Sequence, residues 1–219
     1  GLIREPDRAM STRDIEKFEV LIERRVKREP ISYLTGKRKF WSLPFSVNRS
    51  VLDPRPDSEL LVETALRLFP DADASFSVLD VGTGSGCLLL SILSNRPNAM
   101  GVGVDISLDA LEVAKNNADA LELRNRSNFL CSDWAGALSA SFDLVVSNPP
   151  YISSAIFETL APEISRYEPR LALDGGEDGL TAYRSLLPQL RRILQPEGRI
   201  LLEIELGQSA SVEAIAKQY

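Results

Sequence analysis

The stretch Leu79-Asp80-Val81-Gly82-Thr83-Gly84-Ser85-Gly86 decides the interpretation of the rest of the chain. It joins an apolar run from Phe76 to Val81, typical of a buried strand, to an apolar segment from Cys87 that is typical of a helix. Glycines at alternate positions let the backbone turn sharply and let a ligand approach it closely. The stretch therefore predicts a ligand-binding turn at a sheet edge, unless its glycines serve only the packing of the helix on the strand.

The alternation of strand and helix continues beyond this turn. Strands are expected at Met100 to Asp105, Asn128 to Cys131, Phe142 to Ser147 and Arg199 to Leu206, and helices at about Leu108 to Leu121, Leu180 to Leu194 and Ser209 to Tyr219. Continuous apolar strands that alternate with amphipathic helices predict an α/β fold with a doubly wound, mostly parallel sheet. Ligands of such folds bind beyond the carboxyl ends of the strands.

A smaller unit is expected before the sheet. Apolar residues at helical spacing predict a helix from Ser11 to Glu29, and residues 38 to 52 are typical of a short β-hairpin. Pro54-Arg55-Pro56 forms a rigid connector, and Ser58 is placed to cap a helix that ends near Phe69. We expect the first helix to pack on the main body or to belong to a larger helical unit.

Composition restricts the classes of protein that fit this chain. Its 219 residues, 44% of them hydrophobic, suit one domain with a small appendage and a sizeable core. No stretch approaches the roughly 18 to 20 apolar residues of a membrane helix, so we expect a soluble, cytoplasmic and monomeric protein with no membrane partner. Cys87 and Cys131 lack metal-ligand spacing, and we expect them to be buried free thiols without a metal. The absence of histidine excludes histidine-based catalysis.

Charge is distributed unevenly along the chain. Residues 1 to 40 hold 11 Lys or Arg against 7 Asp or Glu, a net charge of +4, so the rest carries −10 of the total of −6. An acidic body disfavours direct binding of nucleic acid, because contacts of Lys and Arg with phosphates supply most of that affinity. The basic N-terminal stretch is interpreted as either a solvated helix face or a docking surface for an acidic partner.

A carboxylate at the end of the second strand points to the ligand of the glycine turn. Asp105 lies 19 positions after Gly86, where its side chain can accept both hydroxyls of a ribose. The turn runs G-x-G-x-G, unlike the dinucleotide pattern G-x-G-x-x-G, and an anionic Asp80 would repel a pyrophosphate but suit the ammonium of an amino-acid tail. We therefore predict S-adenosylmethionine as the cofactor. Its predicted ligands in this region are Asp80, Gly82, Thr83, Gly84, Ser85, Gly86 and Asp105.

The third strand is followed by Ser132-Asp133-Trp134 at the same edge of the sheet. Asp133 can accept a hydrogen bond from an adenine amino group, and Trp134 can pack beside the ring. An Asp-Trp pair is equally compatible with a turn that has a half-buried indole. Both residues are candidates for cofactor binding.

The fourth strand ends in Ser147-Asn148-Pro149-Pro150-Tyr151, which we interpret as a clamp for a planar NH2 group. Accepting both N–H hydrogens at fixed acceptors favours a nitrogen with more free electron density as the new bond forms. Asn148 supplies a side-chain carbonyl, and Pro149 lacks an N–H that would compete. Pro150 stiffens the turn, and Tyr151 offers a flat apolar face. The alternative is a strand that ends in an Asx turn, with Asn148 bonded to its own backbone.

Taken in order, these motifs resemble class I S-adenosylmethionine-dependent methyltransferases (a Rossmann-like fold) that act on amide or amino nitrogens. Two further stretches narrow the resemblance to the HemK/PrmC family: Val51-Leu52-Asp53-Pro54-Arg55-Pro56-Asp57-Ser58-Glu59 and Glu168-Pro169-Arg170-Leu171-Ala172-Leu173-Asp174-Gly175-Gly176-Glu177-Asp178-Gly179-Leu180. The similarity covers nearly the whole chain. Asp53, Asp57 and Ser58 depart from the commonest Ile, Glu and Thr of the family.

This resemblance implies methylation of the side-chain amide nitrogen (N5) of the glutamine in the Gly-Gly-Gln motif of peptide-chain release factors. It implies that residues 82 to 86, Asp105, Trp134 and Asn148 contact S-adenosylmethionine, and that Asn148 to Tyr151 hold the glutamine. Arg55 is a further candidate for substrate binding. Two other activities stay open, namely glutamine methylation of a ribosomal protein and adenine-N6 methylation of DNA or RNA.

The resemblance also divides the chain. Residues 1–34 are expected to be a remnant of an N-terminal helical domain that binds the release factor, 35–56 a β-hairpin linker, and 57–219 the methyltransferase domain. Family members carry a larger helical domain and a closing hairpin after the final helix, so we expect a chain truncated at both ends.

Overall fold

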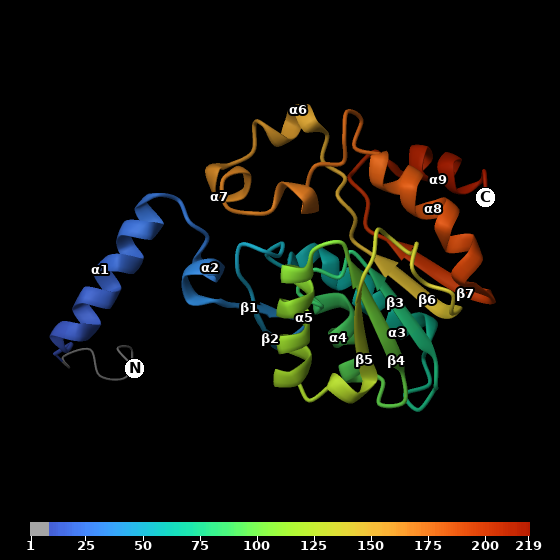
Figure 1. Ribbon diagram of the computed structural model, residues 1–219, viewed down its shortest axis with the longest axis horizontal. Helices are drawn as coiled ribbons and strands as arrows, with labels where there is room; N and C mark the ends of the chain where they lie inside the picture. Colours follow the sequence, from blue (N-terminus) through green and yellow to red (C-terminus); the bar gives the residue numbers. More distant parts are fainter. Residues whose placement is uncertain (1–8) are drawn as a thin grey trace.

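Five parallel strands form the centre of the fold in the computed structural model, which describes residues 9–219 (Figure 1). They are β3 (Ser77–Val81), β4 (Met100–Asp105), β5 (Ser127–Cys131), β6 (Phe142–Ser147) and β7 (Leu194–Leu202). Their order in the sheet is β5-β4-β3-β6-β7, so the direction of winding reverses between β3 and β6. The structure confirms the predicted α/β fold with a doubly wound sheet, and the reversal marks where such sheets bind ligands.

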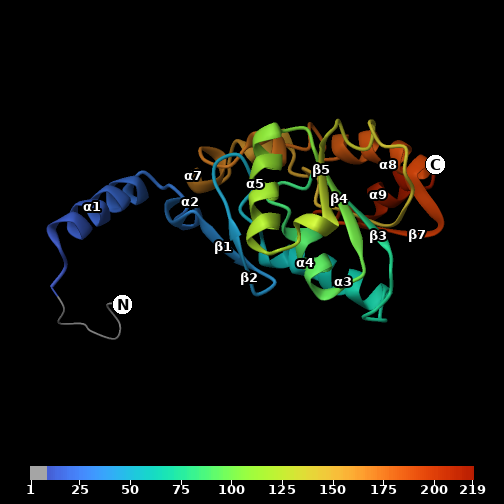
Figure 2. The same ribbon diagram turned by 60° about the horizontal axis from the view of Figure 1, so that its bottom comes forward.

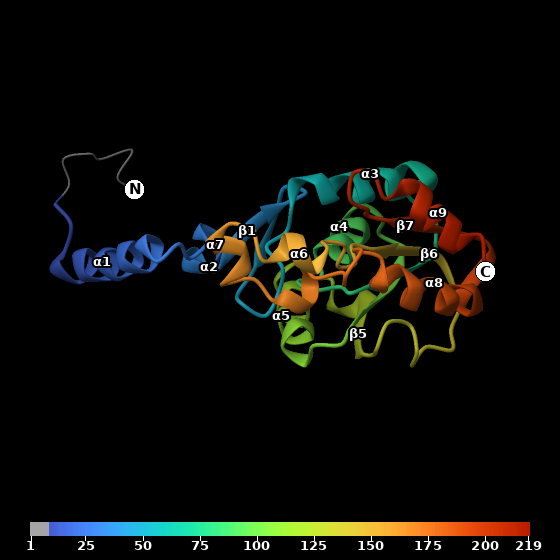
Figure 3. The same cartoon turned by 90° about the horizontal axis from the view of Figure 1, so that it is seen from above.

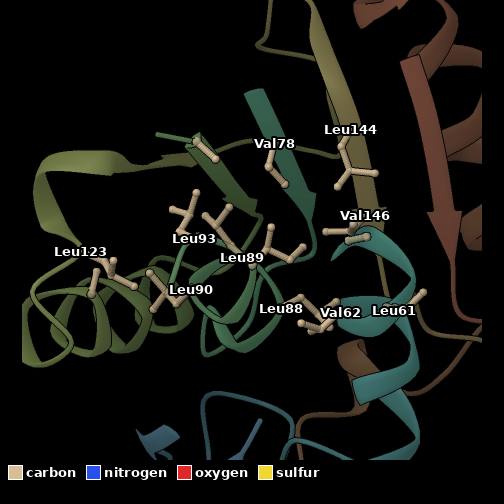
Figure 4. Packing of buried hydrophobic residues seen from close by; sticks show 14 of the residues in the cluster. Leu61, Val62, Val78, Leu88, Leu89, Leu90, Leu93, Leu123, Leu144 and Val146 are labelled. Carbon is tan, nitrogen blue, oxygen red and sulfur yellow. The ribbon is translucent and has the colours of Figure 1, made fainter. Parts of the chain in front are cut away.

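Helices cover both faces of this sheet because alternate strand residues point to opposite sides. On one face, Val78, Leu144 and Val146 pack against α3 (Glu59–Leu68) and α4 (Cys87–Asn95), as Figure 4 shows. On the other face, Leu79, Val81 and Val145 pack against α8 (Thr181–Ile193) and α9 (Ser209–Ala216). Helix α5 (Leu108–Ala120) packs along β4 and β5. The resulting core holds the carboxyl edge of the sheet in place.

The N-terminal part begins with α1 (Thr12–Val26), which projects away from the sheet in all three ribbon views (Figures 1, 2 and 3). Ser11 caps it by accepting a hydrogen bond from the backbone N–H of Asp14 at 3.2 Å. None of its residues is buried, so packing of its apolar stripe on the main body, one of the two expected alternatives, is not realised. Its membership of a larger helical unit stays a prediction. A second short helix, α2 (Ile31–Thr35), follows Pro30 and was not expected.

The predicted hairpin is formed by β1 (Lys37–Phe40) and β2 (Leu43–Ser46), which pair antiparallel. Phe40 and Phe45 enter the core beside α3 and α4. The side chain of Asn117 in α5 binds the backbone of Ser46 through both its oxygen (2.7 Å) and its nitrogen (3.0 Å). These contacts join the hairpin to the sheet domain.

The segment after β6, to which the sequence pattern assigned no helix or strand, contains short helical turns. They are α6 (Ser154–Phe157), α7 (Pro162–Ser165) and the 3-10 turn η3 (Arg170–Ala172); two similar turns, η1 (Pro56–Ser58) and η2 (Arg124–Arg126), precede α3 and β5. In the three views α7 lies beside α2 (Figures 1, 2 and 3). Arg25 and Arg28 both form ion pairs with Glu163, which connects the end of α1 to this segment.

Several sequence-based expectations need correction. Cys87 is half-buried and Cys131 is exposed, so the two thiols are free but neither is fully buried as expected. Strand β7 spans 194–202 and not 199–206, because it follows α8 without a loop and leaves the sheet at its carboxyl edge. Within residues 9–219, no helix combines the length and the apolar character that crossing a membrane requires.

Candidate active site

A cavity of about 560 Å³ opens at the carboxyl edge of the sheet. The loops after β3, β4, β5 and β6 form its floor, and residues around the hairpin-to-α3 connection and η3 form its walls. The predicted site residues that line it are Arg55, Gly82, Thr83, Gly84, Ser85, Asp105, Asp133, Trp134, Asn148, Pro149 and Pro150. Asp80, Gly86 and Tyr151 are not among the lining residues.

The glycine turn is shaped for a ligand at its first two glycines. Gly82 and Gly84 have φ of 72° and 54°, and a Cβ at either position would meet no atom within 4 Å. Gly86 differs, because a Cβ there would lie 3.1 Å from Leu90 and 3.3 Å from Ala114. Helix packing therefore explains Gly86 only, and the two open glycines leave the backbone accessible from the cavity.

Asp105 is held in the cavity wall by backbone donors. Its Oδ2 accepts from the N–H of Gly84 and its Oδ1 from the N–H of Ser107, both at 2.9 Å. Each carboxylate oxygen has capacity for a further hydrogen bond. The side chain is thus oriented in advance and can still accept hydrogen bonds from hydroxyl groups. This arrangement is compatible with the predicted contact with a ribose.

Asp80 lies beneath the turn and not in the cavity wall. Its side chain is buried; Oδ2 accepts from the Thr83 hydroxyl at 2.7 Å and from the N–H of Leu89 at 3.3 Å, whereas Oδ1 has no partner among the described residues. Burial raises the pKa of Asp80 to about 7, although the Thr83 bond opposes this. A cation next to Oδ1 would stabilise the charged form of this buried carboxylate.

The loop after β5 supplies a polar and an aromatic side chain. The N–H of Ser132 donates to the carbonyl of Asp105 at 3.0 Å, which joins this loop to the end of β4. Asp133 is exposed and Trp134 is half-buried, with φ of 51° at Trp134. The indole packs against the core beneath α8. The half-buried indole agrees with the turn interpretation, and because it also lines the cavity its contact with a cofactor stays a prediction.

The turn after β6 presents Asn148 to the cavity. Its Nδ2 donates to the hydroxyl of Ser58 at 3.0 Å, and no hydrogen bond of its side chain to its own backbone is present. The Asx-turn alternative is therefore not realised. Pro149 and Pro150 line the same wall.

The aromatic end of this turn faces a different way from the expectation. Tyr151 is half-buried and packs against the core near α8, and its hydroxyl donates to Oε1 of Glu203 at 3.0 Å. Burial together with the charge of Glu203 raises the pKa of the phenol. The ring stabilises the turn from behind, and stacking on a substrate stays a prediction.

Arg55 reaches the cavity from the connector before α3. It forms an ion pair with the buried Glu168 at 2.6 Å and lies 3.9 Å from Asp53. Burial raises the pKa of Glu168, and Arg55 opposes that shift. The pair joins the proline-rich connector to the segment that follows the Asn148 turn.

Comparison with known proteins adds the family. A model of the methyltransferase small domain matches residues 45–177, and a model of the PrmC N-terminal domain matches residues 1–36. The chain is 48% identical to a release factor glutamine methyltransferase of Caulobacter vibrioides over 98% of this chain and 74% of the relative. The chain belongs to the HemK/PrmC family. A release factor glutamine methyltransferase of Rhodospirillum rubrum is 44% identical over 95% of this chain and 64% of its own length.

Solved structures agree with this HemK/PrmC assignment at the level of the fold. A methyltransferase from Pyrococcus furiosus superposes with a TM-score of 0.58 and 17% identity, covering 90% of this chain and 86% of the other. A ribosomal protein L11 methylase from Lactobacillus delbrueckii subsp. bulgaricus gives 0.55 and 20%, covering 75% and 69%. The chain therefore has the class I methyltransferase fold. The family model and the relatives of 44 to 48% identity show that it is an enzyme of the methyltransferase class.

Two important residues of this HemK/PrmC site escape sequence reasoning. Ser58 does not cap α3 with its side chain, because its hydroxyl instead links Asn148 to Glu203. Glu203 follows β7, 55 positions after Asn148, and no local motif marks it. It falls inside the strand expected at Arg199 to Leu206, where a charged residue within an apolar run was the one signal.

Proposed function

We propose that the protein transfers a methyl group from S-adenosylmethionine to the side-chain N5 of the glutamine in the Gly-Gly-Gln motif of release factors, and so modulates translation termination. The single observation that carries the proposal is the Asn148 side chain in the wall of the same cavity as the glycine turn and Asp105. Relatives named as release factor glutamine methyltransferases support the choice of substrate.

The cavity residues fit S-adenosylmethionine, which when bound supplies an electrophilic methyl group on a sulfonium. The open positions at Gly82 and Gly84 admit the ligand to the backbone, and Asp105 has free capacity for ribose hydroxyls. Asp80 lies beneath the turn and not in the cavity wall, and from there its unpartnered Oδ1 would attract the ammonium of the methionine part. Asp133 would accept from the adenine amino group, and Trp134 would contact the ring.

The protein's contribution to catalysis is alignment of the substrate amide. An amide nitrogen is a weak nucleophile because its lone pair is delocalised into the carbonyl. Oδ1 of Asn148 and the carbonyl of Pro149 would accept hydrogen bonds from the two N–H groups of the glutamine. These bonds favour a nitrogen with more free electron density as the new N–C bond forms. Fixing the nitrogen in line with the methyl group then contributes through proximity.

A strong general base is not needed beforehand. The amide proton becomes acidic only as the new N–C bond forms, and it then leaves along the acceptor at Asn148 or Pro149 to water. The chain contains no histidine, in agreement with a mechanism that does not depend on one. Alignment and hydrogen-bond acceptance are the tasks of the Asn148 to Tyr151 turn.

The parts outside the cavity would serve the protein substrate. Residues 1–34, of which 1–8 lie outside the described residues, would belong to a release-factor-binding domain, 35–56 would be a hairpin linker, and 57–219 the methyltransferase domain. Arg55, at the cavity wall beside the Asn148 turn, would contact the glutamine-bearing loop. We place the protein in the cytoplasm, because its proposed substrate acts on the ribosome. We also propose that it is a monomer with no membrane partner and no direct nucleic-acid partner.

Mass spectrometry of the acceptor after reaction tests the function. Purified release factor, a ribosomal-protein mixture and DNA are incubated separately with methyl-labelled S-adenosylmethionine and the protein. We expect one added methyl on the glutamine of the Gly-Gly-Gln motif, and none when that glutamine is replaced by glutamate. Methylation of DNA alone, or of a ribosomal protein alone, would contradict the proposal.

A further inference from the structure

Glu203 lies behind the cavity wall at the point where β7 ends. Its backbone N–H donates to the carbonyl of Ser147 at 3.0 Å, and its backbone carbonyl accepts from the hydroxyl of Tyr183 at 2.8 Å. The main chain of Glu203 is thus held on both sides, directly beside the last residue of β6. Its carboxylate is not among the groups that line the cavity.

The carboxylate of Glu203 is linked to both ends of the proposed clamp, to one of them through Ser58. Oε2 accepts from the hydroxyl of Ser58 at 2.5 Å, and Ser58 in turn contacts Asn148. Oε1 accepts from the hydroxyl of Tyr151 at 3.0 Å. The carboxylate is therefore linked to the last residue of the turn directly and to the first residue through the Ser58 hydroxyl.

The direction of these bonds decides how the Asn148 amide is turned. A serine hydroxyl has one hydrogen, and the hydrogen of Ser58 is donated to Glu203 at a distance typical of a charge-assisted bond. Ser58 can then only accept from Asn148, so the amide must offer Nδ2. The flipped amide would place its oxygen against the lone pairs of Ser58, or would require Ser58 to leave a carboxylate.

We propose that Glu203, acting through Ser58, is the positioning residue that keeps the Asn148 amide turned with Oδ1 available to the cavity. No described residue donates a hydrogen bond to that Oδ1. The NH2 group of a substrate offers only donors here, so a flipped Asn148 would oppose donor to donor. The identity of that NH2 group rests on the proposed function, whereas the orientation of Asn148 does not.

Steady-state kinetics of variants test the connection. Glu203→Ala and Ser58→Ala are each expected to lower kcat by about 10- to 100-fold, the loss of one charged hydrogen bond, with less than about a twofold change in cofactor affinity. The double variant should be no slower than either single variant, because the two residues act as one chain. Ser58→Thr keeps a hydroxyl and should retain activity, and Glu203→Gln, which keeps a single acceptor, should lose less than Glu203→Ala.

Glu197→Gln is the matched control, because it removes the same charge from an exposed position of β7 and should leave kcat unchanged. Multiplicative losses in the double variant, or a failure of Ser58→Thr to retain activity, would overturn the inference. A loss of cofactor affinity equal to the loss of kcat would do so as well, because it would indicate general damage to the fold.

A spectroscopic measurement separates this inference from the proposed function. In protein labelled with 15N-asparagine, the side-chain NH2 signals of Asn148, assigned with Asn148→Ala, should move in Glu203→Ala and Ser58→Ala but not in Glu197→Gln. Signals that stay in place in Glu203→Ala would refute the positioning role. If release factor is not methylated by the natural chain, the proposed function fails, yet this readout still decides the orientation of Asn148.

Discussion

Replacing Asp80 with asparagine should remove the pH dependence that this residue imposes on folding. The carboxyl is buried beneath the glycine turn and has one unpartnered oxygen. Burial, the largest cause, raises its pKa from 3.8 to about 7. Because the folded-state pKa lies above the unfolded value, the folded state binds more protons between these two pH values. Its contribution to stability is therefore greatest at acid pH and is lost as the pH rises to about 7.

The size of the effect follows from the width of that pH window. Each pH unit inside the window changes the free energy of unfolding by about 1.4 kcal/mol, so two units between pH 5 and pH 7 correspond to about 3 kcal/mol. Asparagine does not titrate and places no charge beneath the turn. The free energy of unfolding of Asp80→Asn, measured relative to that of the natural protein, should therefore be about 3 kcal/mol higher at pH 8 than at pH 5.

Urea unfolding at the two pH values, followed by tryptophan fluorescence, measures this difference. Asp73→Asn at an exposed loop position is the matched control, and its difference from the natural protein should be the same at both pH values within about 0.5 kcal/mol. An Asp80→Asn difference that does not change with pH would refute the argument from burial.

The same variant tests the predicted contact of Asp80 with the cofactor's ammonium. A cation beside Oδ1 favours the charged carboxylate, so the affinity of the natural protein for S-adenosylhomocysteine should increase from pH 5 to pH 8. Calorimetry should find no such increase in Asp80→Asn. Parallel pH profiles in the two proteins would place the ammonium elsewhere.

Four further changes have defined outcomes. Asn148→Ala should lower methyl transfer by about 10²-fold or more while calorimetry finds only modestly weaker cofactor binding, and unchanged turnover would refute the clamp. Asp105→Ala should mainly weaken S-adenosylhomocysteine binding, and an unaltered Kd would contradict the ribose contact. Arg55→Ala leaves the buried Glu168 carboxylate without its ion-pair partner, so urea unfolding should show a loss of about 3 kcal/mol at pH 8 that becomes smaller as the pH is lowered, because burial raises the pKa of Glu168. Leu89→Ala in the fully buried core (Figure 4) should cost about 2 to 5 kcal/mol by the same assay, and a loss under about 1 kcal/mol would contradict the packing described here.

Local sequence patterns were sufficient to predict the strands of the sheet and most of the residues that line the cavity. The bounds of β4 and β6 agree with the prediction because each strand is a continuous apolar run that ends at a polar residue, Asp105 or Ser147. The glycine turn lies between a predicted strand and helix, as expected. Parallel strands place their carboxyl ends at one edge, and so the motifs that follow them meet there.

Short helices, and the surroundings of the first helix, were harder to predict. Helix α2 and the turns α6, α7 and η3 span three to five residues, too few for a helical period to be recognised. The apolar stripe of α1 predicted a buried face, yet α1 buries none of its residues. Periodicity records which face of a helix is apolar, but it contains no information on what covers that face.

The sequence by itself determined the α/β class, the order of the strands along the chain and the residue types that meet at their ends. These depend on local periodicity, turn residues and short spacings. Only the tertiary structure decided that Asp80 supports the glycine turn from below, that Tyr151 turns away from the cavity, and that Ser58 and Glu203 connect behind Asn148. Those contacts join residues up to 145 positions apart, and hydrogen-bond direction over such separations is fixed by packing in space.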